Sequence, residues 1–135
     1  MPALDYYHNT VKRALVKDGW IIVDDSVKVE IGRRRLWIDL MARHLSRNET
    51  ILIEVKGFEK SPSLIGELAQ ATGQYLIYQE ALAEINNSLP IYLAVPDVAH
   101  QGILTELIGQ RVINRVAIKI LAFNPTNEEI TKWLP

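Results

Sequence analysis

The sequence of 135 residues predicts one α/β domain, residues 1–135, with a mixed central sheet flanked by helices. Three observations lead to this fold class. Apolar residues alternate with period two in several short runs and follow the helical period in others. The order of these segments is α-β-β-β-β-α-β-α-β-β, so one long helix separates two groups of strands. We find no internal repeat, low-complexity tract or linker that would divide the chain.

The composition indicates a globular protein with a real core, since 48% of the residues are hydrophobic. Lys and Arg number 15 against 16 Asp and Glu, so any surface that binds nucleic acid must be local. The absence of cysteine excludes disulfides, thiolate metal sites and cysteine nucleophiles. No apolar run approaches the ~20 residues that span a bilayer, and the N-terminus does not resemble a secretory signal. We therefore expect a soluble cytoplasmic protein.

The first half of the chain predicts a helix followed by an antiparallel meander. Apolar residues recur at helical spacing from Tyr7 to Leu15, which predicts an amphipathic helix over residues 5–18 that ends at Gly19. Short polar turns then separate runs rich in β-branched and apolar residues. These runs are the predicted strands 20–25, 27–32, 35–42 and 50–58.

The second half predicts a long helix and three further strands. The helix extends from Ser61 to about Asn86, with Ser61 as N-cap and Pro62 at the first helical position. The nearly all-apolar run 90–96 favours an interior strand that lies parallel to a neighbour after the helical crossover. The remaining predicted elements are a helix over 101–115, a strand over 116–125 and an edge strand or tail over 128–135.

Charged residues interrupt two of the predicted strands. Alternate residues of a strand share a face, so Glu54 and Lys56 point to the same side of their strand. Asp39 interrupts the preceding apolar strand in the same way, and an unpaired carboxylate there costs several kcal/mol. If the two strands are adjacent and antiparallel, Asp39 and Glu54 lie across from each other.

Two carboxylates a few Å apart repel each other, and a divalent cation is the usual remedy where both stay ionised. Mg²⁺, or Mn²⁺ in its place, suits the oxygen ligands of Asp39 and Glu54. Lys56 could then orient a water molecule at the ion or help to deprotonate it. The alternative is a simple ion pair between Glu54 and Lys56 at the edge of the sheet, worth ~0–1 kcal/mol if exposed.

The chain resembles the PD-(D/E)XK nucleases in the order of three features. An acid on one strand is followed by Glu54-Val55-Lys56 on the next strand and then by a long helix. The resemblance implies that Asp39 and Glu54 bind metal and that Lys56 assists the attacking water, although Ile38 stands where the motif has proline. A Glu-x-Lys sequence alone is weak, so the order and spacing of the elements carry the resemblance.

The resemblance also points to residues on the two helices beside the site. In several such nucleases a glutamine on the helix after the Glu-x-Lys strand faces the site. The resemblance therefore implies a place for Gln74 in the site, with Gln70 on the same helical face. Gln74 as an ordinary polar position of the helix is the alternative. On the leading helix, where such nucleases present a glutamate, Asp5 and His8 are the candidates, and a helix-start or surface role for His8 is the alternative.

Segments along nearly the whole chain resemble the XisH family, the fdxN-element excision controlling factors. This resemblance implies a PD-(D/E)XK-like fold and an accessory role in programmed DNA excision. It also implies two partners besides DNA, a site-specific recombinase and an XisI-type companion protein. The segments that carry it are "DYYHNTVKRALVKDGW", "KVEIGRRRLWIDLMA", "IEVKGF", "ATGQYLIYQEAL", "YLAVP" and "ITKWLP".

Arg33, Arg34 and Arg35 form the only dense basic run, in a predicted turn that leads into the Asp39 strand. With Lys60 nearby in the sequence, they could contact the phosphate backbone of DNA without reading its sequence. A solvated hairpin tip that protects a sheet edge is the equally weighted alternative.

The sequence leaves three functions open. The first is a metal-dependent endonuclease, in which a homodimer would suit duplex cleavage. The second is a non-catalytic DNA-binding or recombination-directing factor that works through a partner protein. The third is one half of a complex that is active only when assembled.

Overall fold

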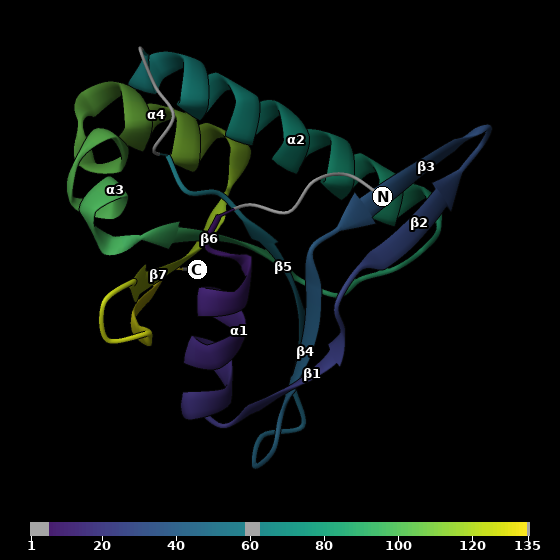
Figure 1. Ribbon diagram of the computed structural model, residues 1–135. Helices are drawn as coiled ribbons and strands as arrows, with labels where there is room; N and C mark the ends of the chain where they lie inside the picture. Colours follow the sequence, from purple (N-terminus) through teal and green to yellow (C-terminus); the bar gives the residue numbers. More distant parts are fainter. Residues whose placement is uncertain (1–5, 59–62, 135) are drawn as a thin grey trace.

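The computed structural model describes residues 6–58 and 63–134, and its centre is a six-stranded mixed sheet (Figure 1). The strand order is β1-β4-β5-β6-β7-β8. These strands are β1 (Trp20–Asp24), β4 (Leu40–His44), β5 (Thr50–Val55), β6 (Ile91–Pro96), β7 (Lys119–Asn124) and β8 (Glu129–Leu134). A separate two-stranded sheet is formed by β2 (Val27–Ile31) and β3 (Arg34–Ile38). The helices are α1 (His8–Lys17), α2 (Leu64–Glu84), α3 (Asp97–Gln101), the 3₁₀ turn η1 (Ile103–Thr105) and α4 (Leu107–Val116).

Strand direction in the main sheet follows the length of the connections. β1, β4 and β5 are antiparallel neighbours, while β6 and β7 lie parallel to β5 because helical crossovers precede each of them. β8 returns antiparallel to β7 through a short turn and forms an edge of the sheet. The predicted mixed sheet flanked by helices is therefore confirmed, including the parallel strand after the long helix.

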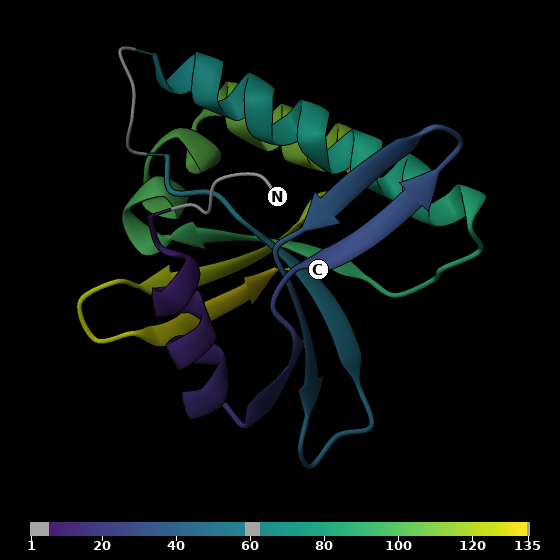
Figure 2. The same ribbon diagram turned by 45° about the vertical axis from the view of Figure 1, so that its right-hand side comes forward.

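Helices cover both faces of the sheet, and Figures 1 and 2 show α1 on one side with α2 and α4 on the other. Alternate side chains of β5 point to opposite faces of the sheet, so this strand contributes to a core on each face. Ile51, Ile53 and Val55 pack in the cluster on the α1 side, while Leu52 packs in the cluster on the α2 side. None of the helices in the described ranges is both long and apolar enough to span a membrane.

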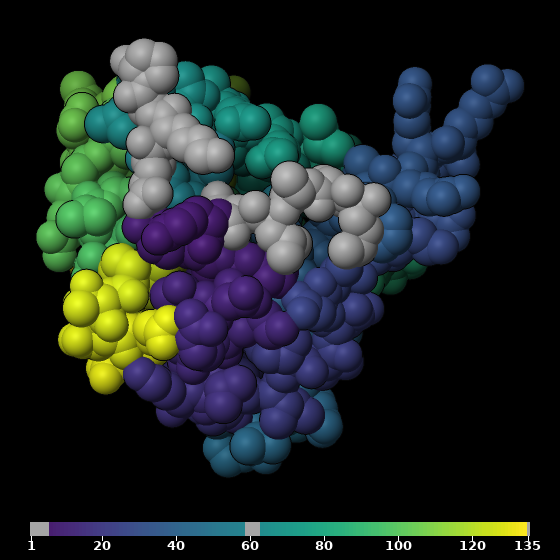
Figure 3. All heavy atoms as spheres, in the orientation of Figure 1, coloured from purple at the N-terminus to yellow at the C-terminus, as the bar shows by residue number. Residues whose placement is uncertain are grey.

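The predicted meander is wrong in its pairing, because one long bent hairpin replaces it. β1 pairs with β4, and β2 pairs with β3 farther along the same two arms. The residues expected to form a turn only bend the first arm, where the Ser26 N–H donates to the Asp24 carboxylate. The predicted strand 35–42 is split at Asp39, which lies between β3 and β4. Figures 2 and 3 show the β2–β3 hairpin projecting from the body of the protein.

Local hydrogen bonds set the ends of the helices differently from the prediction. The predicted cap residues Ser61 and Pro62 lie outside the described residues, and α2 is instead capped by Ser63, whose Oγ accepts from the Gly66 N–H at 3.0 Å. The single helix predicted over 101–115 is wrong. The Thr105 hydroxyl donates to backbone carbonyls in the preceding turn, and the chain forms α3, η1 and α4 in place of one helix.

Two glycines give a matched test of this packing. A Cβ added at Gly109 in α4 would lie 2.1 Å from the Ile103 carbonyl oxygen, whereas one added at Gly73 in α2 would meet no atom within 4 Å. Gly109→Ala should lower the free energy of unfolding by about 1–3 kcal/mol, because the backbone of η1 must move. Gly73→Ala should raise it by about 0.5–1 kcal/mol through helix propensity. Urea titration of both variants checks this, and equal stability would contradict the close approach of α4 to η1.

Candidate functional site

The antiparallel register of β4 and β5 brings Asp39 and Glu54 together. Leu40 pairs with Ile53, so the next position along the two strands aligns Asp39 with Glu54. The Asp39 carboxylate accepts from the Val55 N–H at 2.8 Å, and the Glu54 carboxylate accepts from the Asp39 N–H at 3.3 Å. Each carboxylate therefore accepts a hydrogen bond from the backbone of the opposite chain segment, at the point where the β4–β5 ladder stops.

The surroundings of Glu54 disfavour its charged form. Burial, followed by the negative charge on Asp39, raises the pKa of Glu54 to about 9. Hydrogen bonds from the Asp39 backbone and the Tyr78 hydroxyl oppose this shift in the pKa without cancelling it. Near neutral pH, and without a cation, Glu54 is protonated. The two carboxyl groups then carry less charge than the sequence suggests.

Tyr78 of α2 lies over this pair and shares its environment. Burial raises the pKa of the Tyr78 hydroxyl, and the negative charges of Glu54 and Asp39 add to that rise. The hydroxyl donates to the Trp37 carbonyl at 3.1 Å, so its proton is directed at the backbone of β3.

Lys56 lies on the same face of the chain and contacts α2. Its Nζ donates to the Gln70 amide oxygen at 2.8 Å and lies 3.4 Å from the Glu67 carboxylate. The Lys56 and Glu67 side chains are 14% and 15% exposed. Sequence reasoning missed Glu67, although its position three residues before Gln70 places both on one helical face. Gln74 is half-buried one turn farther along α2, and its part in the site stays a prediction.

Among the predicted site residues that the structure describes, Asp39 and Glu54 are the two acids that lie together. In residues 6–58 and 63–134, no three or more His, Cys, Asp or Glu side chains gather as metal ligands. Asp39 and Glu54 nevertheless have the chemistry that a hard divalent cation requires, because both supply carboxylate oxygen ligands and lie side by side. Mg²⁺ or Mn²⁺ therefore fits the residues present.

The other predicted site residues lie elsewhere or outside the described ranges. His8 is buried at the start of α1, and its Nε2 contacts the Asp25 carboxylate at the bend between β1 and β2. Lys12 donates to the other oxygen of Asp25 at 2.6 Å. The hydrogen bond from Lys12 is the largest influence that lowers the pKa of Asp25. In this structure His8 ties the leading helix to the hairpin. Lys60 lies outside the described residues.

The basic run occupies the tip of the projecting hairpin. Arg33 lies in the turn, and Arg34 and Arg35 begin β3. All three side chains are exposed. Because this hairpin joins β4 directly at Asp39, the arginines and the acid pair lie at opposite ends of β3. A strand of this length spans about 17 Å.

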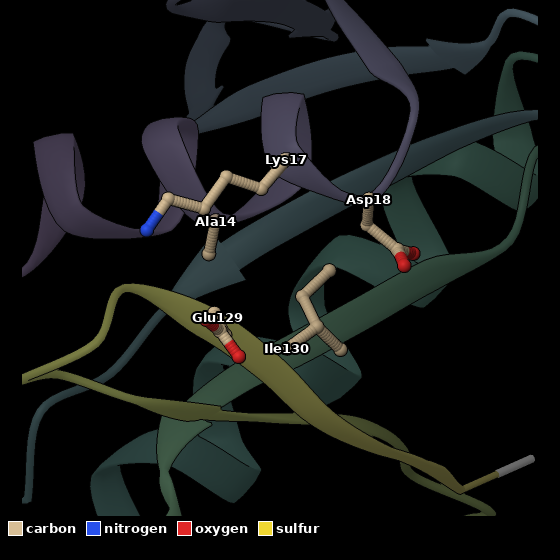
Figure 4. Close-up of a pocket in the computed structure, with 5 residues that line it drawn as sticks. All are labelled: Ala14, Lys17, Asp18, Glu129 and Ile130. Carbon is tan, nitrogen blue, oxygen red and sulfur yellow. The ribbon is translucent and has the colours of Figure 1, made fainter.

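One hollow in the surface lies apart from the acid pair. Figure 4 shows one of about 230 Å³ between α1 and β8, lined by Ala14, Lys17, Asp18, Glu129 and Ile130. The Lys17 amino group donates to the Asn127 carbonyl at 2.6 Å rather than to a carboxylate of this hollow. Its place between a helix and an edge strand is that of an ordinary packing gap.

Known proteins resemble this chain along nearly its full length. The family model described as XisH protein matches residues 1–131. The crystal structure of an XisH family protein from Nostoc punctiforme PCC 73102 is 31% identical, with a TM-score of 0.89 over 97% of this chain and 100% of that one. The crystal structure of an fdxN element excision controlling factor protein from Anabaena variabilis is 32% identical, with a TM-score of 0.88 over 96% of this chain and 98% of that one. No curated protein gives a significant match. The chain therefore belongs to the XisH family.

Proposed function

We propose that this protein is a DNA-acting accessory factor in the programmed excision of a DNA element, and that it is a metal-dependent endonuclease-like protein. Membership of the XisH family and the similarity to an excision controlling factor support the role in excision. The observation that carries the endonuclease proposal is the Asp39–Glu54 pair across β4 and β5, with Lys56 two residues farther along the chain.

The restriction-endonuclease-like core is part of the same proposal. An acid at the break between two strands, a Glu-x-Lys sequence on the next antiparallel strand and a helical crossover to a parallel strand support it. In this mechanism Asp39 and Glu54 would hold Mg²⁺ or Mn²⁺. The ion would supply Lewis-acid polarisation of a phosphodiester and lower the pKa of water.

The chain's own residues would provide orientation and charge. The bond from the Val55 N–H fixes the Asp39 carboxylate, so the ligand does not have to be ordered when the ion binds. Gln70 holds the Lys56 amino group at 2.8 Å, and Glu67 balances its charge. A phosphate that approaches Lys56 would compete with Glu67 for that charge. Lys56 would then stabilise negative charge on the reacting phosphate or position the attacking water.

A second candidate function is a non-catalytic factor that directs recombination through a partner. The observation in its favour is that Lys56 is engaged by two residues of α2, while burial raises the pKa of Glu54 and disfavours its charged form. The fold would then act as a scaffold for DNA, for an XisI-type companion protein or for the recombinase. Cleavage that appears only after assembly into a homodimer, or with the companion, would identify an enzyme active only in a complex. Assembly without cleavage would identify a scaffold.

Metal binding gives the first test. We expect calorimetric titration of Mg²⁺ or Mn²⁺ to show binding to the parent protein and none to Asp39→Asn, because the ion loses one of its two carboxylates. The surface variant Glu80→Gln is the matched control and should bind as the parent does. At tenfold excess over the dissociation constant, the ion should add about 1.4 kcal/mol to the free energy of unfolding. If neither protein binds metal, the endonuclease proposal fails and the scaffold becomes the working function.

The pKa of Glu54 gives a second prediction. That pKa is about 9 in the folded protein against 4.5 for an ordinary glutamate, so the unfolded chain binds fewer protons here between those values. The free energy of unfolding of the metal-free protein should therefore fall as the pH rises from about 5 to about 9, by at most about 1.4 kcal/mol for each pH unit.

Glu54→Gln should remove this fall, since an amide does not titrate. Denaturant unfolding of both proteins at several pH values checks the prediction, with Glu84→Gln on the surface of α2 as the control. Parallel pH profiles for the parent and Glu54→Gln would show that Glu54 ionises normally in the folded protein.

The basic hairpin gives a third prediction. Replacing Arg33, Arg34 and Arg35 together by glutamine should weaken binding to a labelled DNA duplex. The slope of the logarithm of the binding constant against the logarithm of salt concentration should become less steep by about 0.9 for each DNA phosphate that the variant no longer neutralises. Fluorescence anisotropy at several salt concentrations measures this. The control replaces Arg111 and Arg115 of α4, and identical slopes for both variants would assign the arginines to edge protection instead.

A further inference from the structure

Three aromatic side chains from distant parts of the chain meet where the curled sheet brings β1 close to β8. The ring centroids of Trp20 and Trp133 are 5.7 Å apart, with their planes inclined by 34°. Tyr92 of β6 meets Trp133 edge to face, with centroids 5.1 Å apart. With Arg47 and Glu49 from the β4–β5 loop, these three rings line a pocket of about 280 Å³.

The burial of the three rings differs in a way that leaves aromatic surface open to the pocket. Trp20 is 2% exposed, and its indole N–H donates to the Asp18 carboxylate at 3.2 Å. Burial and this hydrogen bond therefore hold the Trp20 ring in place as a wall of the pocket. Tyr92 and Trp133 are only half-buried. An aromatic group that enters the pocket can contact these two rings without unpacking the core.

Charged groups surround the rings in an arrangement that suits an anion joined to a planar ring. The Arg47 guanidinium lies 5.7 Å from the centroid of Trp20, and the Lys119 amino group lies 5.9 Å from that of Tyr92. Glu49 is 3.5 Å from Arg47, and both side chains are about half exposed. An exposed pair of this kind is weak, so a ligand can replace it at little cost.

We propose that this aromatic pocket binds a single unpaired nucleotide. The base would stack on Trp133 and Tyr92, since aromatic side chains are stacking platforms for any base. The phosphate would contact Arg47 and Lys119. The Glu49 carboxylate would accept a hydrogen bond from an exocyclic amino group, which favours cytosine, adenine or guanine over thymine.

The pocket is separate from the acid pair. Trp20, Tyr92 and Trp133 belong to the cluster on the α1 face of the sheet, whereas Lys56 contacts α2 on the opposite face. The inference rests on the proposed function only for the source of the nucleotide, which would be DNA opened during excision. The acid pair can bind metal whether or not the aromatic pocket binds a base.

The three tryptophans of the chain allow a test with an internal control. In ¹⁵N-labelled protein, 2′-deoxycytidine 5′-monophosphate should shift the indole signals of Trp20 and Trp133 in a saturable manner. The signal of Trp37, which lies on β3 outside the pocket, should stay in place. Thymidine 5′-monophosphate should bind more weakly, and inorganic phosphate should leave the indoles unchanged. No saturable shift at millimolar nucleotide would overturn the proposal, and equal shifts with phosphate alone would reduce the pocket to an anion site.

Two variants localise the binding. Arg47→Gln alters an exposed side chain, so it should fold normally and weaken binding about threefold to tenfold. Arg111→Gln on α4 is the matched control and should bind as the parent does. Trp133→Leu keeps apolar contact with Trp20 and should weaken binding by about tenfold or more, because the base loses its stacking partner.

Metal titration of the same proteins separates the two proposals. Arg47→Gln should bind Mg²⁺ or Mn²⁺ as the parent does while its nucleotide binding falls. Nucleotide binding that is unchanged in both Arg47→Gln and Trp133→Leu would refute the aromatic pocket. Metal binding absent from a parent protein that still binds nucleotide would refute only the endonuclease proposal.

Discussion

The hydrogen bond from the Val55 N–H to the Asp39 carboxylate, 2.8 Å long, lies where the β4–β5 ladder stops. At Asp39 a side chain takes the position that a backbone carbonyl would occupy in a continuing ladder. The chain therefore turns away before this point, and the β2–β3 hairpin leaves the sheet to pack its inner face against α2. The same bond orders the Asp39 carboxylate beside Glu54. One interaction thus positions both the projecting arginines and the acid pair.

The repulsion between the carboxylates of Asp39 and Glu54 can be relieved in two ways. Without a cation, Glu54 keeps its proton, because burial and Asp39 raise its pKa to about 9. With a divalent cation, both acids could ionise, and protons would be released as the ion binds. The Lys56 amino group, which follows Glu54 on the same face, already pairs with Glu67. Proton uptake and the proposed metal binding would therefore compete at one place, on the α2 face of the sheet.

The opposite face depends on α1, which fills the curve of the sheet with Val11 and Leu15. Because α1 contacts both β1 and β8, the two edges of the sheet approach each other, and Trp20 meets Trp133. This approach leaves β1 and β8 as the two edge strands of an open sheet. It also assembles an aromatic pocket from residues more than a hundred positions apart. The two faces of one sheet thus present two different chemistries.

The sequence by itself determined the mixed sheet, the long helix before a parallel strand and the common face of Glu54 and Lys56, because these depend on local periodicity. It also indicated Asp39 as a partner for Glu54, since a lone carboxylate on an apolar strand is costly. Only the tertiary structure decided that the strand breaks at Asp39, that Glu67 reaches Lys56, and that the predicted helix over 101–115 divides. These features depend on hydrogen bonds and packing between segments far apart in the chain, for which a local pattern carries no signal.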